Sequence, residues 1–330
     1  MEIIKVSNLT KKFIKLVAVD NINFTVKQGE VFGFLGPNGA GKTTTIKMLI
    51  TLLNPTNGTA TIAGHDIIKD RNQVRQNIGI VFQEPALDIE LTGEENLEYH
   101  ARMYGLKKEN RKKRINEVLQ LVDLEEKRKV LVKNYSGGMK RRLEIARGLM
   151  HYPTVLFLDE PTLGLDAQTR RAIWAYIKKM NKEEKTTIFL TTHYMDEADY
   201  LCDRIGIIDH GKILVMDSVT NLKNSVGKDL ITLSCNDLNK LKTKLEKESW
   251  ISKIKQHDTT LTLSVEKGDE KIPTIIEIAQ KTKVKIKSIS VRKPTLDDVF
   301  LSYTGRTMRD DEQHNNNTNS VPPRFRGGRH

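Results

Sequence analysis

The residues best suited to chemistry form a glycine-rich loop between a predicted buried strand at 30–35 and a predicted helix from 45 onwards. A loop with the spacing G-x-x-x-x-G-K-[ST] directs its backbone N–H groups and the positive end of a helix dipole at an anion. We expect Lys42 to reach the β- and γ-phosphates of a nucleoside triphosphate, and the Thr43 hydroxyl to ligate Mg²⁺. The loop residues are Gly36, Pro37, Asn38, Gly39, Ala40, Gly41, Lys42, Thr43 and Thr44.

Two carboxylates follow a second apolar run. Residues 155–158 predict a central parallel strand that ends on Asp159 and Glu160. Because adjacent strand positions face opposite sides of a sheet, the two acids are expected to do different work. Asp159 is suited to hold Mg²⁺ through water, and Glu160 to take the proton of an attacking water. The alternative is a pair of solvated acids in a turn.

Two more polar residues end predicted buried strands. Gln83 follows the run 78–82, and His193 ends the run 186–193. Such a residue is often only a solvated strand end or a structural histidine. Because parallel sheets bind ligands at the carboxyl ends of their strands, both side chains could face the phosphates, and His193 could bond the γ-phosphate oxygens.

A second helix N-terminus is predicted where Ser136, Gly137 and Gly138 precede a helical pattern at 140–149. A serine caps such a helix, and the free N–H groups offer a possible second phosphate site. The pattern belongs to a block of helical periodicity over about 88–150, which predicts an inserted α-helical subdomain. Its basic run at 107–114 is expected to be a solvated helix face, with a lipid contact as the alternative.

Composition places limits on the class of protein. A chain of 330 residues has room for one large domain and a smaller one. Its 38% hydrophobic and 29% charged residues are typical of a soluble globular protein. The sequence shows neither an apolar run long enough to span a bilayer nor a signal-peptide pattern, so we expect a cytosolic location. Cys202 and Cys235 lack metal-ligand spacing and are expected to be buried, reduced thiols.

The five stretches, in the order loop, Gln, Ser-Gly-Gly, Asp-Glu and His, resemble the nucleotide-binding subunit of ATP-binding cassette (ABC) transporters over residues 1–220. The resemblance implies ATP and Mg²⁺ as cofactors. Phe13, an aromatic among lysines whose pattern alone favours a core position, resembles the residue that stacks on adenine. Gln83 matches the residue that senses Mg²⁺ and the water, and His193 the switch histidine.

The same resemblance assigns residues to a dimer. Ser136, Gly137 and Gly138 match the signature turn, and Asp166, in Gly164-Leu165-Asp166, resembles the loop that links the two sites of a dimer. Tyr135 and Met139 replace the commonest residues at the two ends of the signature. This variant is similar to a subgroup, the drug-resistance-type subunits that pair with separate membrane permeases.

The last third of the chain supports this subgroup. A strand at 229–235, two short strands over 251–265 and a strand at 284–291 are joined by helices at 237–248 and 271–282 in a β-α-β-β-α-β order, which suggests a ferredoxin-like domain. The segment 293–301 resembles the one that closes the C-terminal domain of these exporter ATPases.

The predicted fold class is α/β. It combines a P-loop NTPase core, an antiparallel β edge and the inserted helical subdomain with a small α+β C-terminal domain. We expect a nucleotide-binding domain at 1–220, an accessory domain at 221–305 and a disordered tail at 306–330.

By resemblance, the expected function is ATP binding and hydrolysis in an ABC exporter. Two copies would face each other head to tail, with each ATP between the 36–44 loop of one chain and the signature turn of the other. A multi-span permease of the ABC-2 type would dock on the helical subdomain, especially 84–104, at the cytoplasmic face of the membrane.

Two alternatives belong to other classes. One is a soluble cassette ATPase that acts on nucleic acid or ribosomes, which the net charge of +12 would suit. A single cassette per chain and the lack of a long coiled coil argue against it. The other is a plain nucleotide sensor, which would lack the catalytic acid that Glu160 provides.

Overall fold

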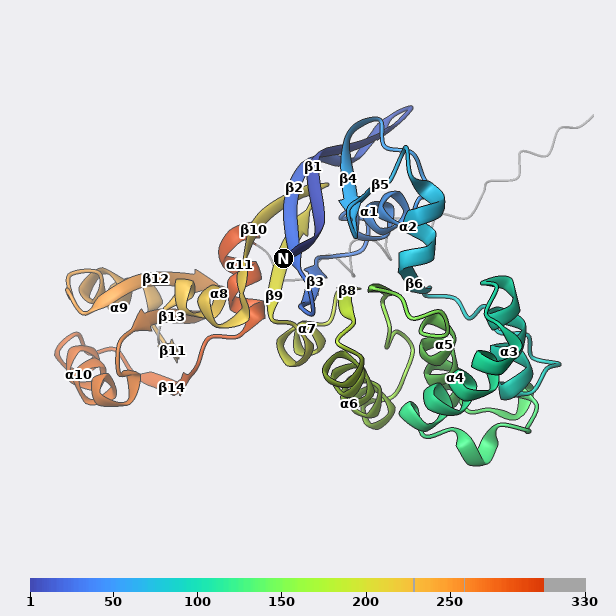
Figure 1. Cartoon of the computed structure of the whole chain (residues 1–330). Helices are drawn as coiled ribbons and strands as arrows, with labels where there is room; N and C mark the ends of the chain where they lie inside the picture. The colour runs from blue at the N-terminus through green and yellow to red at the C-terminus, as the bar shows by residue number, and fades with distance from the viewer. Residues whose placement is uncertain (228, 258, 306–330) are drawn as a thin grey trace, which may run out of the picture. The chain divides into compact units, whose positions relative to one another are not determined.

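The structure, a computed structural model, describes residues 1–227, 229–257 and 259–305. These residues fall into two compact units, Met1–Asp217 and a second that begins at Ser218. Figure 1 labels the elements of both units. None of the helices in the described part of the chain has the length and apolar character needed to span a bilayer. Cys202 and Cys235 are buried free thiols, as expected.

A mostly parallel sheet forms the centre of the first unit. Its order is β10 (Lys212–Ser218), β9 (Arg204–Asp209), β3 (Val31–Leu35), β8 (Thr187–Thr192), β7 (Val155–Asp159) and β6 (Ile78–Val81). The pairs β9–β3, β3–β8, β8–β7 and β7–β6 are parallel. Strands β3, β7 and β8 are buried at every position, and therefore read as continuous rather than alternating runs.

An antiparallel sheet confirms the predicted β edge. Its order is β2 (Leu16–Lys27), β1 (Glu2–Phe13), β4 (Asn57–Ile62) and β5 (His65–Asp66). The sequence pattern predicts three short runs before residue 27, whereas the structure has two strands of 12 residues each. The register of this pair shifts at several points, and both Asn8 and Asn21 have a φ of 51°. Such bulges interrupt the two-residue period inside a continuous strand.

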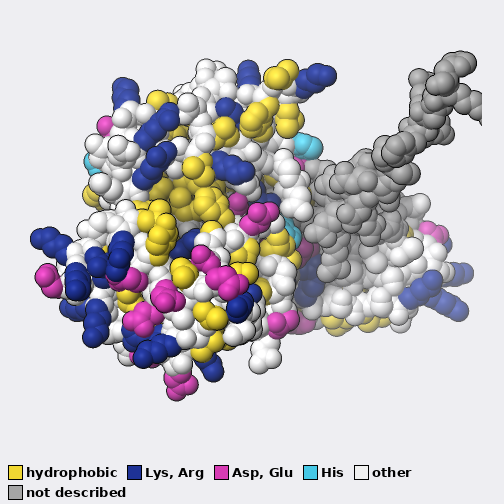
Figure 2. Space-filling model, turned by 90° about the vertical axis from the view of Figure 1, so that its right-hand side faces the viewer, with side chains coloured by type: hydrophobic (Ala, Val, Ile, Leu, Met, Phe, Trp, Pro, Cys, Tyr) yellow, Lys and Arg dark blue, Asp and Glu magenta, His cyan; other side chains and the backbone are white. Residues whose placement is uncertain are grey.

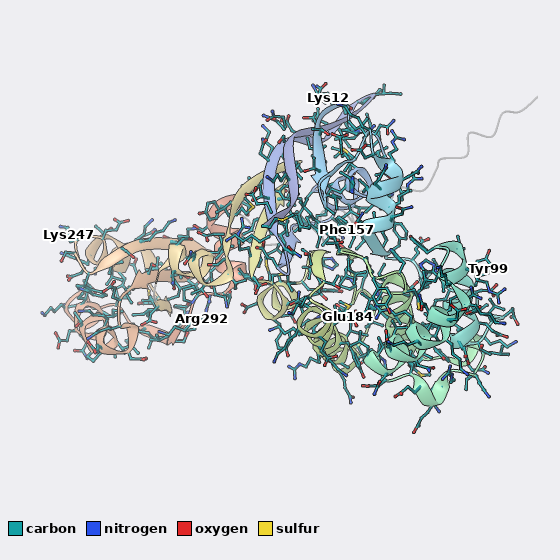
Figure 3. All side chains as sticks on the ribbon, in the orientation of Figure 1. Lys12, Tyr99, Phe157, Glu184, Lys247 and Arg292 are labelled. Atoms are coloured by element: carbon teal, nitrogen blue, oxygen red, sulfur yellow. The ribbon has the colours of Figure 1, made fainter. Side chains whose placement is uncertain are left out.

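Aromatic side chains fill the core next to the parallel strands. Neighbouring ring centroids lie 5.3 to 6.1 Å apart, and each such pair stabilises the fold by about 0.5–1.5 kcal/mol beyond its buried area. Figure 3 labels Phe157 near the middle of the first unit. This packing joins β2 of the antiparallel sheet to β3, β7 and β8 of the parallel sheet. The rings belong to Phe24, Phe32, Phe34, Phe157 and Phe189.

A helical block lies between β6 and β7 in the sequence. It contains α3 (Gly93–Met103), α4 (Lys108–Leu121) and α5 (Gly137–Gly148), as Figure 1 shows. Helix α3 begins with a capping box. The backbone N–H of Glu95 donates to Thr92 Oγ1 at 3.2 Å, and the Thr92 N–H donates to the Glu95 carboxylate at 2.8 Å.

The basic run at 107–114 is not solvated throughout. Arg114 is only 1% exposed, and its guanidinium donates to the carbonyl of Leu149 at 2.8 Å. It also pairs at 3.1 Å with Glu184, which ends α6 (Ala167–Glu184) and is labelled in Figure 3. The expectation of a solvated face was therefore wrong for Arg114, because local charge spacing does not reveal an ion pair formed across 70 residues.

The second unit is built on a four-stranded antiparallel sheet. The sequence β11 (Asp229–Cys235), α9 (Leu238–Leu245), β12 (Ile251–His257), β13 (Thr260–Val265), α10 (Gly268–Lys281) and β14 (Ile286–Arg292) has the predicted β-α-β-β-α-β order. The strand order is β12, β13, β11, β14, and every neighbouring pair is antiparallel. Helix α8 (Val219–Val226), which precedes the sheet, is not predicted by the sequence pattern.

Helix α11 (Leu296–Thr304) corresponds to the closing segment at 293–301. The predicted disordered tail at 306–330 lies outside the described residues.

Candidate active site

A cavity of about 650 Å³ opens at the carboxyl edge of the parallel sheet, a size suited to a small-molecule ligand. Segments far apart in the sequence meet there: the β1–β2 hairpin, the 36–44 loop, and residues that follow β6, β7 and β8. Its lining is Phe13, Leu16, Ala18, Asn38, Gly39, Gly41, Lys42, Thr43, Thr44, Gln83, Glu160, Leu163 and His193.

The loop runs from the end of β3 to α1 (Lys42–Leu49), where sequence reasoning expected it. Glycine is required at two of its positions. A Cβ at Gly36 would stand 2.2 Å from the carbonyl oxygen of Ile208. Gly41 has a φ of 105°, and a Cβ there would stand 2.5 Å from the carbonyl oxygen of Ala18. The chain therefore turns into α1 too tightly for any side chain at either position.

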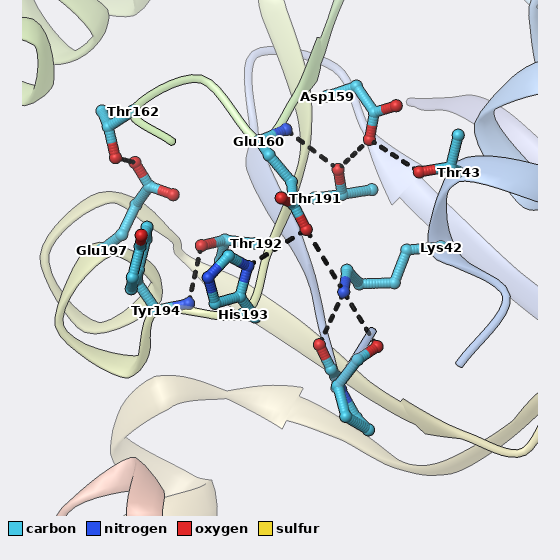
Figure 4. A network of polar contacts seen from close by, with 12 residues as sticks. Lys42, Thr43, Asp159, Glu160, Thr162, Thr191, Thr192, His193, Tyr194 and Glu197 are labelled. Carbon is cyan, nitrogen blue, oxygen red and sulfur yellow. Dashed lines mark hydrogen bonds and ion pairs between the residues drawn. The ribbon is translucent and has the colours of Figure 1, made fainter. Parts of the chain in front are cut away.

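Lys42 is the buried cation of the site. Its side chain is 4% exposed, and its Nζ donates to the carbonyls of Gly36 at 2.7 Å and Pro37 at 3.0 Å. The same atom lies 3.4 Å from Oε1 of Glu160 (Figure 4). Burial lowers the pKa of Lys42, although the charge of Glu160 opposes this. A phosphate group at the loop would offer this ammonium group a stronger partner than two carbonyls.

Thr43 and Asp159 form a pair of oxygen ligands beside the loop. Thr43 Oγ1 lies 3.3 Å from Asp159 Oδ1, which also accepts from the Thr191 hydroxyl at 2.5 Å (Figure 4). Asp159 is 3% exposed. A carboxylate and a hydroxyl side by side are the hard oxygen donors that Mg²⁺ prefers. The residues present therefore fit this ion, with Gln83 on the same cavity wall.

Glu160 is held as an ionised carboxylate. Burial raises its pKa, but a hydrogen bond from His193 and the charge of Lys42 outweigh burial, and the pKa lies below its usual value. The Nδ1 atom of His193 is 3.1 Å from Glu160 Oε1. The backbone of Glu160 has a φ of 48°, which is uncommon for a residue with a side chain and persists only where neighbours hold it. The arrangement can accept a proton.

Phe13 lies on the cavity wall with 48% of its surface exposed. The interpretation of Phe13 as a core residue, which its local pattern favours, is therefore wrong. Lys11 Nζ stands 5.3 Å from the centre of its ring. Leu16 and Ala18, from the paired strand, complete an apolar surface beside it.

The signature residues lie away from this cavity. Among the described residues that line it, Ser136, Gly137, Gly138 and Asp166 do not appear. Ser136 is exposed and caps α5, with its Oγ accepting from the Met139 N–H at 3.2 Å. Asp166 is also exposed and caps α6. One chain thus brings the loop, Gln83, Glu160 and His193 together, but not these residues.

Sequence reasoning missed several residues of the site. Leu16, Ala18 and Leu163 line the cavity, and Thr191 orients Asp159. A signal existed for Thr191, because it precedes the predicted His193 by two positions and so faces the same side of its strand. The apolar liners carried no comparable signal.

A P-loop after β3, an acid pair at the end of β7 and an inserted helical block define a P-loop ATPase of the cassette class. Residues 19–163 match the family described as ABC transporter, and residues 218–304 match the family described as ATP-binding protein DrrA1-3-like, C-terminal domain. The chain belongs to the ATP-binding subunits of ABC transporters, in the drug-resistance group, and is an ATPase.

Individual relatives agree with this assignment. The linearmycin resistance ATP-binding protein LnrL of Bacillus subtilis is 40% identical over 93% of this chain and 100% of its own length. The daunorubicin/doxorubicin resistance ATP-binding protein DrrA of Streptomyces peucetius is 38% identical over 93% and 94%. These relatives decide against the alternative of an ATPase that acts on nucleic acid or ribosomes.

Solved structures support the cassette fold. The dimeric post-hydrolysis structure of the ATP-binding cassette MJ0796, bound to ADP and Pi, is 31% identical with a TM-score of 0.58. It covers 65% of this chain and 98% of that one. The protein cbiO1 from Clostridium perfringens, described as part of the ABC transporter complex cbiONQ, is 30% identical with a TM-score of 0.63. It covers 68% of this chain and 93% of that one.

Proposed function

We propose that this chain hydrolyses Mg²⁺-ATP in the cavity at the 36–44 loop and thereby drives an exporter. The observation that carries this proposal is the position of the Glu160 carboxylate, which shares one cavity with Lys42 and His193 and contacts both. Glu160 accepts the proton of the attacking water, and His193 orients this carboxylate through Nδ1. The buried Lys42 ammonium and the backbone N–H groups of the loop stabilise charge on the phosphates.

The metal site follows from the same geometry. Thr43 and Asp159 would hold Mg²⁺, and Gln83, which lines the same cavity, would contact the ion or the water. When bound, the ion neutralises phosphate charge. Phe13, with its exposed ring, is suited to stack on the adenine base.

We propose that two copies assemble head to tail around ATP. Ser136, Gly137 and Gly138 are accessible at the start of α5 and lie outside the chain's own cavity, so they are free to contact the nucleotide of a partner copy. Asp166 would lie at the same interface. The description of the MJ0796 cassette as dimeric agrees with this arrangement. The cassette would span residues 1–220, with the accessory domain at 221–305.

The proposed permease contact is the segment 84–104. A groove of about 560 Å³ lies between the end of β6 and α3 and α5. Its rim is apolar and exposed, with Tyr99 at 63% and Met103 at 68%. Figure 2 looks at the side that carries α3 and shows hydrophobic side chains gathered across the middle of this face. Such a surface fits a multi-span permease of the ABC-2 type, whose substrate would include antibiotics like those in the relatives' names.

The experiment is purification of the full chain from its own cell membranes in a mild detergent, followed by identification of stoichiometric partners. A hydrophobic multi-span protein that is lost in Tyr99→Glu, but kept in the control Leu52→Glu, supports the proposal. Leu52 is also a large hydrophobic residue with a similar exposed fraction, 59%, and it lies outside the segment. Recovery of ribosomal proteins or nucleic acid without any membrane protein would contradict both the exporter role and a location at the cytoplasmic face.

A further inference from the structure

Arg141 lies in the second turn of α5 and is almost completely buried, with 8% exposed. An arginine side chain has five N–H donors, and each of them finds an acceptor here. Nε donates to the carbonyl of Pro161 at 2.6 Å. Nη1 donates to the carbonyl of Phe82 at 2.6 Å and to Glu144 at 2.9 Å. Nη2 lies 3.3 Å from the carbonyl oxygens of both Asp159 and Glu160.

Glu144, one turn further along α5, completes the contact. It is 1% exposed, and its second oxygen accepts from the backbone N–H of Ala86 at 2.7 Å. The pair Arg141–Glu144 therefore binds backbone on both sides of Gln83, at residues 82 and 86. It also binds the backbone at 159–161, around Glu160. Two proposed site residues from different strands are tied to one helix.

The geometry at Glu160 needs such support. A residue with a side chain and a φ of 48° is strained, and is kept there by its surroundings. On one side, the Glu160 N–H donates to the carbonyl of Thr191 at 3.1 Å. On the other side, the carbonyls of three successive residues converge on the Arg141 guanidinium. The direction of the Glu160 side chain depends on both attachments.

We infer that Arg141 is a positioning residue for ATP hydrolysis, because its guanidinium fixes the backbone that carries Gln83 and Glu160 to the helix that begins at Ser136. The inference rests on the proposed role of Glu160 as the base. Lysine cannot replace Arg141, since its single nitrogen has three donors in a different geometry and leaves buried carbonyls unpaired.

The test is steady-state ATP turnover by the full chain with Arg141→Lys. We expect kcat to fall roughly 10–100-fold while KM for ATP changes less than about threefold, because a displacement near 1 Å at the reacting groups costs rate rather than ground-state binding. The matched control is Arg142→Gln. Arg142 is the next residue of α5 and contacts Val122 and Tyr176 instead of the site. It should keep kcat within about twofold.

A double-mutant cycle separates positioning from general damage. If Arg141 acts through Glu160, then Arg141→Lys added to Glu160→Gln should lower the residual single-turnover rate by less than about threefold. If Arg141→Lys lowered the rate of the Glu160→Gln variant as much as it lowers the rate of the native chain, the inference would be overturned. An unchanged kcat in Arg141→Lys alone would overturn it too. Where Arg141→Lys does not fold, Glu144→Gln takes its place and should give the same split between kcat and KM. Normal turnover in Glu160→Gln would instead overturn the proposed function.

Discussion

The Nδ1 atom of His193 lies 3.1 Å from Oε1 of Glu160. The same oxygen lies 3.4 Å from Nζ of Lys42, so two donors from different segments converge on one carboxylate oxygen. Both contacts favour the ionised carboxylate and keep its pKa below the usual value despite burial. Phosphate bound at the loop would compete with Glu160 for Lys42, which links nucleotide binding to the freedom of the proposed base.

The exposed ring of Phe13 gives a prediction about base recognition. Phe13→Ala should raise the Kd for ATP about 5–10-fold, because loss of stacking on one base costs about 1–3 kcal/mol, part of which the apolar neighbours Leu16 and Ala18 retain. Phe13→Trp should bind ATP as well as the native chain. Ile14→Ala, at a fully exposed neighbour, is the control and should leave the Kd unchanged. Equal Kd values for all variants, measured by titration calorimetry, would remove Phe13 from the site.

Ser136→Ala tests the shared site of the proposed dimer. ATP binding to the single chain should change less than about twofold, while the dimer dissociation constant in ATP should rise about tenfold or more, because a hydrogen bond to charged phosphate contributes about 1.5–3 kcal/mol. Ser218→Ala is the control, since Ser218 also caps a helix. Sedimentation in the presence of ATP measures the dimer dissociation constant of each variant. Equal weakening of ATP binding and dimerisation by Ser136→Ala would count against a signature that acts across the interface.

The burial of Glu197 gives a prediction about how the stability of the fold depends on pH. It is fully buried in α7 (Met195–Leu201), and it accepts from Thr162 at 2.7 Å and Trp174 at 2.9 Å (Figure 4 shows Glu197 and Thr162). Burial raises the pKa of Glu197 above 4.5. The folded state then binds the proton more tightly than the unfolded state. The contribution of this group to stability is therefore present below pH 4.5 and is lost as pH rises through the folded pKa.

Glu197→Gln removes this titration while it keeps an acceptor for Thr162. We expect the variant to gain stability relative to the native chain as pH rises above 4.5, measured by urea unfolding at pH 5 and pH 8. Glu183→Gln, at an exposed position of α6, is the control and should show no such trend. A difference between Glu197→Gln and the native chain that stays constant with pH would contradict this account.

The parts of the site that could be predicted from the sequence are those whose residues lie in short, contiguous stretches. The 36–44 loop, the acids after β7 and the polar residues after β6 and β8 follow from apolar runs and their ends. In a parallel sheet these ends meet at one edge whatever the connections between them. The sheet of the accessory domain could be predicted because strand and helix patterns alternate along this part of the sequence.

Other features depend on contacts between distant segments. Nothing in the local pattern around Arg141 distinguishes it from Arg142, yet one is buried against β6 and β7 and the other contacts Val122. The sequence around Arg114 likewise predicts a basic surface, whereas in the structure Arg114 pairs with Glu184. The bulges at Asn8 and Asn21 broke the alternation that would have revealed two long strands.

ATP turnover by Glu160→Gln tests the central claim most directly, since this change removes the carboxylate and preserves its shape. The account predicts that the variant binds ATP at least as tightly as the native chain, because Lys42 is no longer paired with a carboxylate, while kcat falls about 10²–10⁴-fold, the usual contribution of a general base. Hydrolysis at the native rate would contradict the assignment of Glu160, and with it the proposed mechanism by which this subunit drives export.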